Sequence, residues 1–159
     1  MPQADANRVL TRRDIGILVL LGLAAAATAL WQKAQPQPLP ADDIAIRAVI
    51  SEQVDAFRRG DDRAAYTYAA PDIQAQFSAP DDFMAMVKAH YKPVLNAHKL
   101  SFAARSRNIQ AHADMRRQEA FIIDAGGLTH HLNYIMQKQP DGSWKIAGCQ
   151  LLPATLRDV

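Results

Sequence analysis

The stretch that decides the fold runs from Met115 to Pro153 and reads MRRQEAFIIDAGGLTHHLNYIMQKQPDGSWKIAGCQLLP. Segments rich in β-branched and aromatic residues are separated by two turn sequences, at 126–127 and at 140–143. Such a pattern is typical of antiparallel strands joined by tight turns. We therefore predict a three-stranded meander in this part of the chain.

The two turns also predict how the strands pair. A two-residue turn at the glycine pair places Glu119 opposite Tyr134. Closure of the second turn places Met136 opposite Ile146, and Tyr134 opposite Gly148. Glu119, Tyr134 and Gly148 are then neighbours across three strands, and a slip of one residue would move every side chain of a strand to the other face.

In this register the two faces of the meander differ. The face expected to receive the helices is apolar and carries Phe121, Ile123, Leu132, Met136, Trp144, Ile146 and Leu152. The other face is mixed and carries Gln118, Ile122, His131, Asn133, Ile135, Lys145, Ala147, Cys149 and Leu151. A mixed face of this kind indicates a surface that is partly covered by a partner.

Four polar residues are unusual on the predicted apolar face, namely Glu119, His130, Tyr134 and Gln150. Because Gly148 has no side chain, the register opens a hollow beside the Tyr134 ring. A few polar groups around an apolar hollow are what a small-molecule site requires. The predicted pocket residues are Tyr134, Gln150, Trp144, Phe121, Leu132 and Gly148.

Catalysis at this hollow is a weaker prediction. A partly buried Glu119 carboxylate has the chemistry of a base, with Tyr134 as a hydrogen-bond donor and His130 as a proton shuttle. In the competing interpretation, Glu119 reaches water at the end of the sheet and hydrogen-bonds Tyr134, and Gly148 marks a bulge. No complete catalytic set is evident, so the enzyme question stays open, with a non-enzymatic role favoured.

We predict no metal and no cofactor. His130 and His131 are adjacent in a strand and point to opposite faces, so they cannot bind one ion together. No other histidine, cysteine or carboxylate stands at a zinc-like spacing, and there is no glycine-rich phosphate loop. The single cysteine, Cys149, excludes an intrachain disulfide and is predicted to be a buried, inert thiol.

The charge of the chain is concentrated at its N-terminal end. Of 18 basic and 16 acidic residues, positions 1–41 hold 4 and 2, a net charge of +2, which leaves 14 of each from 42 onward. A neutral domain lacks the clustered positive charge that nucleic-acid binding requires. Nucleic acid is therefore excluded as a partner.

Residues 15–32 predict a single transmembrane helix, or signal anchor, because they contain no charged residue. As a helix they span about 27 Å, which matches a thin hydrocarbon core. Arg8, Arg12 and Arg13 precede this segment, so residues 1–14 are expected in the cytoplasm and the rest outside. The prediction is a single-pass protein of the cell (inner) membrane with a periplasmic domain.

Two alternatives to a retained anchor stay open. A secretory signal cleaved near Ala29 would release the domain, and Arg12-Arg13 is a weak match to a twin-arginine export signal. After either segment, residues 33–41 are rich in proline and predict an extended linker. The domain itself is expected over 42–159.

The part upstream of the meander predicts helices and one further strand. Asp42 or Asp43 is expected to cap a helix that ends at Gly60, with an apolar stripe of Ile46, Val49, Ile50, Val54 and Phe57. Shorter helices follow to about residue 91, and 99–107 alternates like a strand. Helices followed by strands predict an α+β fold, with the helices packed on a curved antiparallel sheet of about four strands.

Two stretches carry a family resemblance, AFRRGD at 56–61 and DGSWKIAGCQLLP at 141–153. Together with the order of elements, they resemble the nuclear transport factor 2-like, or steroid-isomerase-like, superfamily. Within it, they are similar to a bacterial domain family of unassigned function. The resemblance covers about Ile44 to Pro153 and implies a cone-shaped domain with a pocket between the helices and the sheet.

The resemblance also implies frequent dimerisation through the sheet, here through the face with His131, Ile135, Cys149 and Leu151. It carries over no catalytic residue, because the isomerases' Asp base and Tyr/Asp pair cannot be matched to positions of this chain. We therefore predict a membrane-tethered module that binds a small apolar ligand or a protein partner. The alternative is an acid–base enzyme that uses Glu119 and Tyr134, and a further alternative is a purely structural dimer.

Overall fold

The computed structural model of the protein describes residues 38–110 and 112–152. The predicted cytoplasmic tail, the predicted span at 15–32, the cleavage site near Ala29 and most of the linker lie outside the described residues. Among the helices that are described, none is long and apolar enough to cross a bilayer.

The described part has an α+β architecture in which the helices come first, as predicted. The helices are α2 (Ala41–Arg59), α3 (Asp62–Thr67), α4 (Pro71–Gln74), α5 (Pro80–His90) and α6 (Lys92–Leu95). The strands are β1 (Ala97–Phe102), β2 (Arg107–Ile109), β3 (His112–Asp124), β4 (Thr129–Lys138) and β5 (Trp144–Leu152). The strands form one antiparallel sheet in the order β1-β3-β4-β5, with β2 paired to β3.

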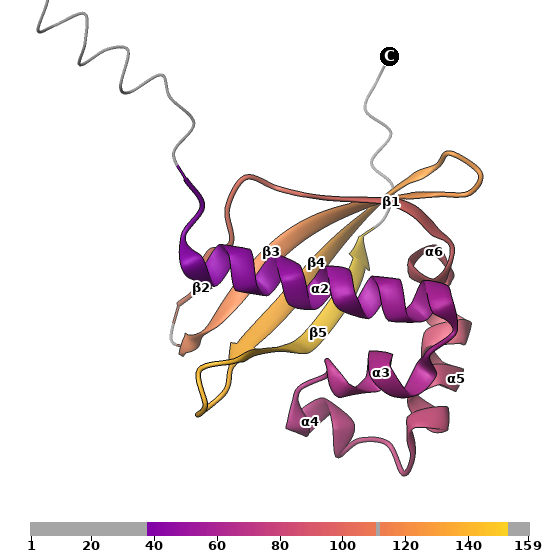
Figure 1. The fold of residues 1–159 in the computed structure, drawn as a ribbon, viewed down its shortest axis with the longest axis horizontal. Helices are drawn as coiled ribbons and strands as arrows, with labels where there is room; N and C mark the ends of the chain where they lie inside the picture. The colour runs from indigo at the N-terminus through magenta and orange to yellow at the C-terminus, as the bar shows by residue number, and fades with distance from the viewer. Residues whose placement is uncertain (1–37, 111, 153–159) are drawn as a thin grey trace, which may run out of the picture. The chain divides into compact units, whose positions relative to one another are not determined.

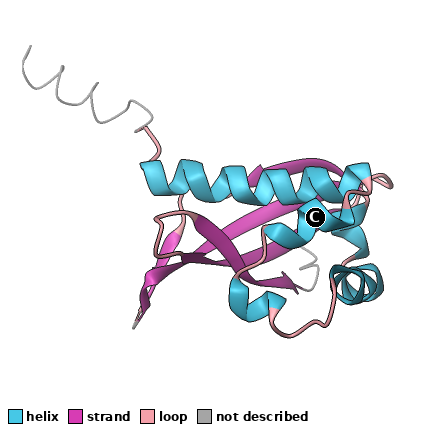
Figure 2. Ribbon diagram, turned by 60° about the horizontal axis from the view of Figure 1, so that its bottom comes forward, coloured by secondary structure: helices cyan, strands magenta, loops and turns pink. Residues whose placement is uncertain are grey.

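Helix α2 crosses one face of the sheet, and the shorter helices gather near its C-terminal end (Figure 1). A view from another direction shows the same arrangement, in which the described helices all lie on one side of the sheet (Figure 2). The predicted stripe of α2 is confirmed, since Ile46, Ile50, Val54 and Phe57 are buried. Gly60 ends the helix in the left-handed conformation, with φ of 68°, which favours glycine.

The predicted cap at the start of α2 is wrong. Pro40 occupies the capping position, and no side chain caps the helix. The Asp42 carboxylate instead accepts hydrogen bonds from Arg116 at 3.0 Å, Lys138 at 3.2 Å and the Trp144 indole at 3.3 Å. These donors lie on β3, β4 and β5, so Asp42 fixes the start of α2 to the sheet.

Asp43 strengthens this attachment from a buried position. Its side chain is 1% exposed, it accepts a hydrogen bond from the Ser106 hydroxyl, and it lies 3.5 Å from the Arg116 guanidinium. A buried carboxylate must be hydrogen-bonded or paired with a cation. Asp43 finds these partners in Ser106 and Arg116, and it therefore does not cap the helix. We name Asp42, Asp43 and Arg116 the α2 anchor.

The first hairpin differs from the predicted turn by one residue. Asp124 is paired with Leu128, and the Asp124 carboxylate accepts hydrogen bonds from the backbone N–H groups of Gly126 and Leu128. Gly127 has φ of 84°, as expected for a three-residue turn with a left-handed third position. The aspartate before the glycines therefore selects a longer turn than the glycine pair alone suggested.

This change shifts the whole β3–β4 register. Glu119 is paired with Asn133, and Tyr134 with Gln118, so the predicted pairing of Glu119 with Tyr134 is wrong. The faces of β3 are exchanged as a result. Gln118 and Ile122 are buried under the helices, whereas Phe121 and Ile123 face outward, contrary to the prediction.

The second hairpin begins in the predicted register and then departs from it. Met136 is paired with Ile146, as predicted, but a bulge at Ala147 follows, and Tyr134 is paired with Cys149 rather than with Gly148. The extra residue in β5 reverses which side chains face the helices beyond it. Cys149 and Leu151 therefore pack toward the helices, and Gln150 and Leu152 belong to the outer face.

Candidate functional site

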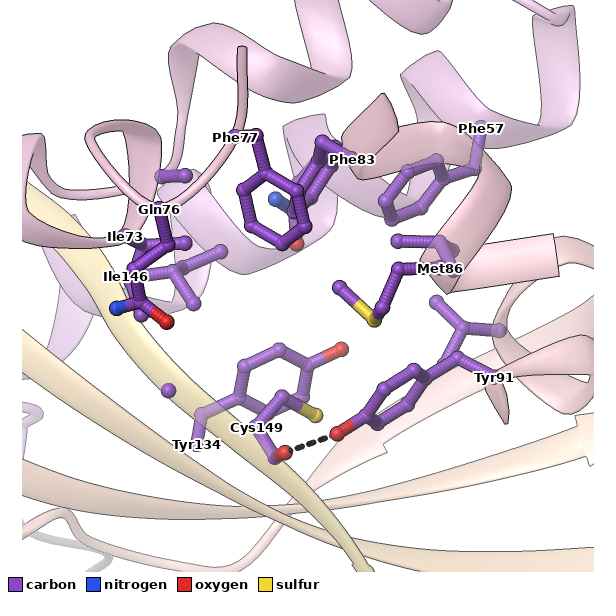
Figure 3. A pocket seen from close by; sticks show the side chains of 15 residues that line it. Phe57, Ile73, Gln76, Phe77, Phe83, Met86, Tyr91, Tyr134, Ile146 and Cys149 are labelled. Carbon is purple, nitrogen blue, oxygen red and sulfur yellow. Dashed lines mark hydrogen bonds between the residues drawn. The ribbon is translucent and has the colours of Figure 1, made fainter. Parts of the chain in front are cut away.

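A hollow of about 220 Å³ lies between the shorter helices and the strands β4 and β5 (Figure 3). Its wall is largely apolar and its mouth is partly open. The residues that line it are Gln53, Phe57, Ala69, Ile73, Gln76, Phe77, Phe83, Met86, Val87, Tyr91, Val94, Tyr134, Ile146, Gly148 and Cys149.

The helices that form the roof are short and are set by proline. Pro71 and Pro80 stand in the first turns of α4 and α5, where the missing N–H costs nothing. Between these helices, Phe77 contacts Phe83 edge to face, with 5.4 Å between the ring centroids. Aromatic side chains of this size keep the roof away from the sheet, so a space remains below them.

Tyr134 and Cys149 are neighbouring polar groups in the floor of the hollow. Tyr134 is 1% exposed, and its hydroxyl points toward the middle of the hollow (Figure 3). Burial raises the pKa of Tyr134 well above its ordinary value, and the Cys149 thiol beside it raises this pKa further. Burial also raises the pKa of Cys149 to about 12. Both groups are therefore protonated at neutral pH.

Tyr91 connects the roof of the hollow to its floor. Its hydroxyl donates a hydrogen bond of 2.6 Å to the backbone carbonyl of Cys149. Burial raises the pKa of Tyr91, so this hydroxyl keeps its proton at neutral pH as well. The bond holds the residue between α5 and α6 against β5 and occupies the Tyr91 donor.

The two amides in the wall also have partners. Gln53, which is buried, donates its side-chain N–H to the Ala65 carbonyl at 3.1 Å. Gln76 donates to the Asp72 carbonyl at 3.0 Å, close to the mouth. None of the fifteen lining side chains carries a charge. The hollow therefore has the composition of a binding site for an apolar molecule rather than that of an acid–base site.

The residues predicted for the pocket are divided between two faces of the sheet. Tyr134 and Gly148 do line the hollow. Leu132 and Trp144 are buried in the core outside it, and Gln150 is exposed on the outer face. A Cβ atom at Gly148 would point toward Ile135, 3.7 Å away, so the missing side chain does not create the hollow as predicted.

Phe121 completes this correction. Its ring stacks on the His131 ring with 4.7 Å between the centroids, on the outer face of the sheet, opposite the described helices. The one-residue shift of the first hairpin places it there. It cannot contribute to the hollow, and the aromatic wall comes from the helices instead.

The three weak catalytic candidates are not brought together. Glu119 lies on the outer face, where its carboxylate is 3.6 Å from His131. His130 lies at the β3–β4 hairpin, and its Nε2 is 2.7 Å from the Asp124 carboxylate. Only Tyr134 reaches the hollow. Within the described residues, no group of three or more histidine, cysteine or acidic side chains is arranged to hold a metal ion.

The sequence did not point to the residues of the helices and their connections that form most of the hollow. Ile73, Phe77, Phe83, Met86 and Tyr91 lie in segments whose periodicity predicts burial alone. A signal was present in the two short, proline-started helices, which are too short to cover the sheet closely. Sequence periodicity shows that a residue is buried, but it does not show that the helices and the sheet leave a space between them.

The predicted surface for a homodimer is also divided. His131 and Ile135 lie on the outer face, whereas Cys149 lines the hollow and Leu151 packs against the core. The bulge at Ala147 causes this division. The outer face instead gathers half-buried apolar side chains of Phe121, Ile123, Ile135 and Leu152.

Three comparisons place the chain among known proteins. The comparison with curated proteins finds no match. Among solved structures, a designed NTF2-like protein whose title begins Rd1NTF2_05 is similar, with 20% sequence identity over 71% of this chain and 100% of its own, and a TM-score of 0.44. The kinship with steroid isomerases stays a prediction.

The family comparison covers the whole described domain. The model of the family described as "Domain of unknown function (DUF4864)" matches residues 40–159, which include α2, the hollow and the complete sheet. This agrees with the resemblance of 56–61 and 141–153 to a bacterial family of unassigned function. The chain therefore belongs to the family described as Domain of unknown function (DUF4864).

Proposed function

We propose that the protein is a membrane-tethered, extracytoplasmic module that binds a small apolar molecule in the hollow. The observation that carries this proposal is the hollow itself, about 220 Å³ in volume and lined by uncharged, mainly apolar side chains. A dry apolar cavity of about 150 Å³ holds a benzene molecule. By that scale, the hollow suits a ligand of about nine non-hydrogen atoms.

The alternative, an acid–base enzyme, has less support. It needs Glu119 and Tyr134 at one site, but the sheet separates them. Tyr134 and Cys149 both retain their protons at neutral pH, and neither can serve as a general base there. Binding without chemistry is the role that the floor of the hollow supports.

A matched pair of substitutions on α5 tests the binding site. Met86 points into the hollow (Figure 3), whereas Ala89 is exposed on the same helix. Met86→Trp should fill the hollow and abolish binding of indane, a neutral probe of suitable size, as followed by calorimetry or NMR shifts. Ala89→Trp should bind indane like the wild type. Equal binding by all three proteins, or by none, would overturn the proposal.

The tether is supported by the uncharged segment at 15–32 and the arginines that precede it. Fractionation of cells that express the full chain tests it. We expect the protein in the membrane fraction, with the domain open to protease added on the extracytoplasmic side. Intact chain in the cytosol would refute the tether without affecting the binding site.

We also propose that two copies associate through the outer face of the sheet. The apolar side chains gathered there, with the Phe121 and His131 rings stacked, are the supporting observation. Ile135 lies in the middle strand pair of this face. Ile135→Arg should convert a dimer to a monomer in sedimentation experiments, while Arg117→Ala, on the same face, should not. A wild-type monomer would end this proposal.

A further inference from the structure

The charge of a ligand is restricted by the wall of the hollow. All fifteen lining residues are uncharged, and the nearest acid–base groups of the floor, Tyr134 and Cys149, stay protonated. An ion that entered would lose water without gaining an opposite charge, and this transfer is strongly unfavourable. A ligand that must place a carboxylate or an ammonium group inside the hollow should therefore bind weakly.

One hydrogen-bond donor at the floor of the hollow is available to a ligand. The Tyr134 hydroxyl points into the hollow beside the Cys149 thiol, which is only a weak acceptor, and within the described residues it has no hydrogen bond to a nitrogen or oxygen atom. The other phenol of the hollow, Tyr91, already donates to a backbone carbonyl at 2.6 Å, which is a strong acceptor. Tyr134 is therefore the donor that a ligand can recruit at the lowest cost.

We infer that the ligand is an uncharged molecule of mainly apolar character with one oxygen acceptor, which accepts a hydrogen bond from the Tyr134 hydroxyl. This inference rests on the proposed function, because it describes the occupant of the same hollow. The buried Tyr134 hydroxyl has no strong acceptor among the described residues, and an acceptor oxygen of the ligand removes the cost of leaving this donor unsatisfied. This new bond leaves the hydrogen bond from Tyr91 to the Cys149 carbonyl in place.

Isosteric probes separate shape from polarity. Indane, phthalan and isoindoline share one bicyclic frame and differ at one ring position, which is CH₂, an ether oxygen or an ammonium group at neutral pH. Benzoate supplies an anion of similar size. Each dissociation constant is measured by NMR titration on the full chain in detergent.

Phthalan should bind the wild type about five-fold more tightly than indane, because a net neutral hydrogen bond has this effect. Isoindoline and benzoate should bind at least about ten-fold more weakly than indane.

Removal of single hydroxyl groups shows which residue provides the preference. Tyr134→Phe should bind indane like the wild type and should lose the preference for phthalan. Tyr66→Phe is the matched control, since the Tyr66 hydroxyl donates to the Gln74 carbonyl and the residue does not line the hollow. This variant should keep the preference. Thermal unfolding of both variants shows that they fold.

The outcomes distinguish this inference from the proposed function. If indane and phthalan bind the wild type equally, or if Tyr134→Phe keeps the preference, the inference is wrong while the binding site stands. If isoindoline or benzoate binds as well as indane, the restriction on charge is wrong. If no neutral probe binds, the proposed function fails, and the inference fails with it.

Discussion

The Tyr91 hydroxyl donates a hydrogen bond of 2.6 Å to the backbone carbonyl of Cys149 and so joins the roof of the hollow to its floor. Tyr91→Phe removes this donor and leaves a part-buried carbonyl without its partner. We expect a loss of about 1 kcal/mol in the free energy of unfolding, measured with urea. Amide exchange in α6 should also become faster. Unchanged stability and exchange would show that the bond does not hold the roof.

The α2 anchor contains two adjacent aspartates with different burial, 1% exposed for the Asp43 side chain and 31% for that of Asp42. Asp43→Ala leaves Arg116 without its buried partner and should cost about 3 kcal/mol of unfolding free energy. Asp42→Ala removes an ion pair that water already screens and should cost about 1 kcal/mol or less. Urea unfolding of both variants tests the order, and equal losses would contradict it.

The Cys149 thiol should be inert in the folded protein. Burial raises its pKa to about 12, and thiol reagents attack the thiolate. We expect no reaction with Ellman's reagent at pH 8 until the protein is unfolded, and then reaction of one thiol per chain. Rapid labelling of the native protein would contradict the geometry of the floor.

The same raised pKa makes stability depend on pH in alkaline solution. Below the pKa of the unfolded thiol, near 9, both states hold the proton and stability is constant. As the pH rises above this value, only the unfolded state releases it, so stability falls by up to about 1.4 kcal/mol per pH unit. Cys149→Ala should reduce this slope between pH 9 and 10, measured by urea unfolding.

The Asp124 carboxylate should give an acid dependence of the opposite sense. The hydrogen bond from His130 is the main cause that lowers the pKa of Asp124, and the backbone N–H of Leu128 lowers it further. Its contribution to stability is present above the ordinary pKa near 3.8 and is lost as the pH falls through the lowered value. The stability difference between wild type and Asp124→Asn should therefore shrink from pH 5 to pH 2.

A surface substitution provides the control for this experiment. Asp114 is exposed and its side chain has no hydrogen bond or ion pair within the described ranges, so Asp114→Asn should follow the wild type over the same pH range. A constant difference between wild type and Asp124→Asn at all pH values would show that His130 does not stabilise the charged carboxylate.

Sequence patterns were sufficient for most elements of this fold. The end of α2 at Gly60, the shorter helices that follow to about residue 91 and the three strands of the meander lie close to their predicted positions. These features depend on local chemistry, namely helical spacing, a left-handed glycine and proline in a first turn. The α+β order followed directly from them.

The faces of the sheet were harder to predict because they depend on single residues. The Asp124 carboxylate lengthens the first turn, and this one hydrogen-bonding group exchanges the two faces of β3. Tyr134 and Gly148 were assigned to the hollow and do line it, but its wall comes from helices far away in sequence. The distance between the helices and the sheet is set by tertiary packing, and it cannot be predicted from the periodicity of the sequence.

The bulge at Ala147 determines which side chains of β5 line the hollow and which lie on the outer face of the sheet. With this additional residue, β5 directs Trp144 and Ile146 inward at one end and Cys149 and Leu151 inward at the other. If the same residues paired without the bulge, strict alternation would turn the thiol outward and bring an amide, Gln150, under the roof. Family members that keep this bulge together with the thiol after it should therefore share the same binding preference.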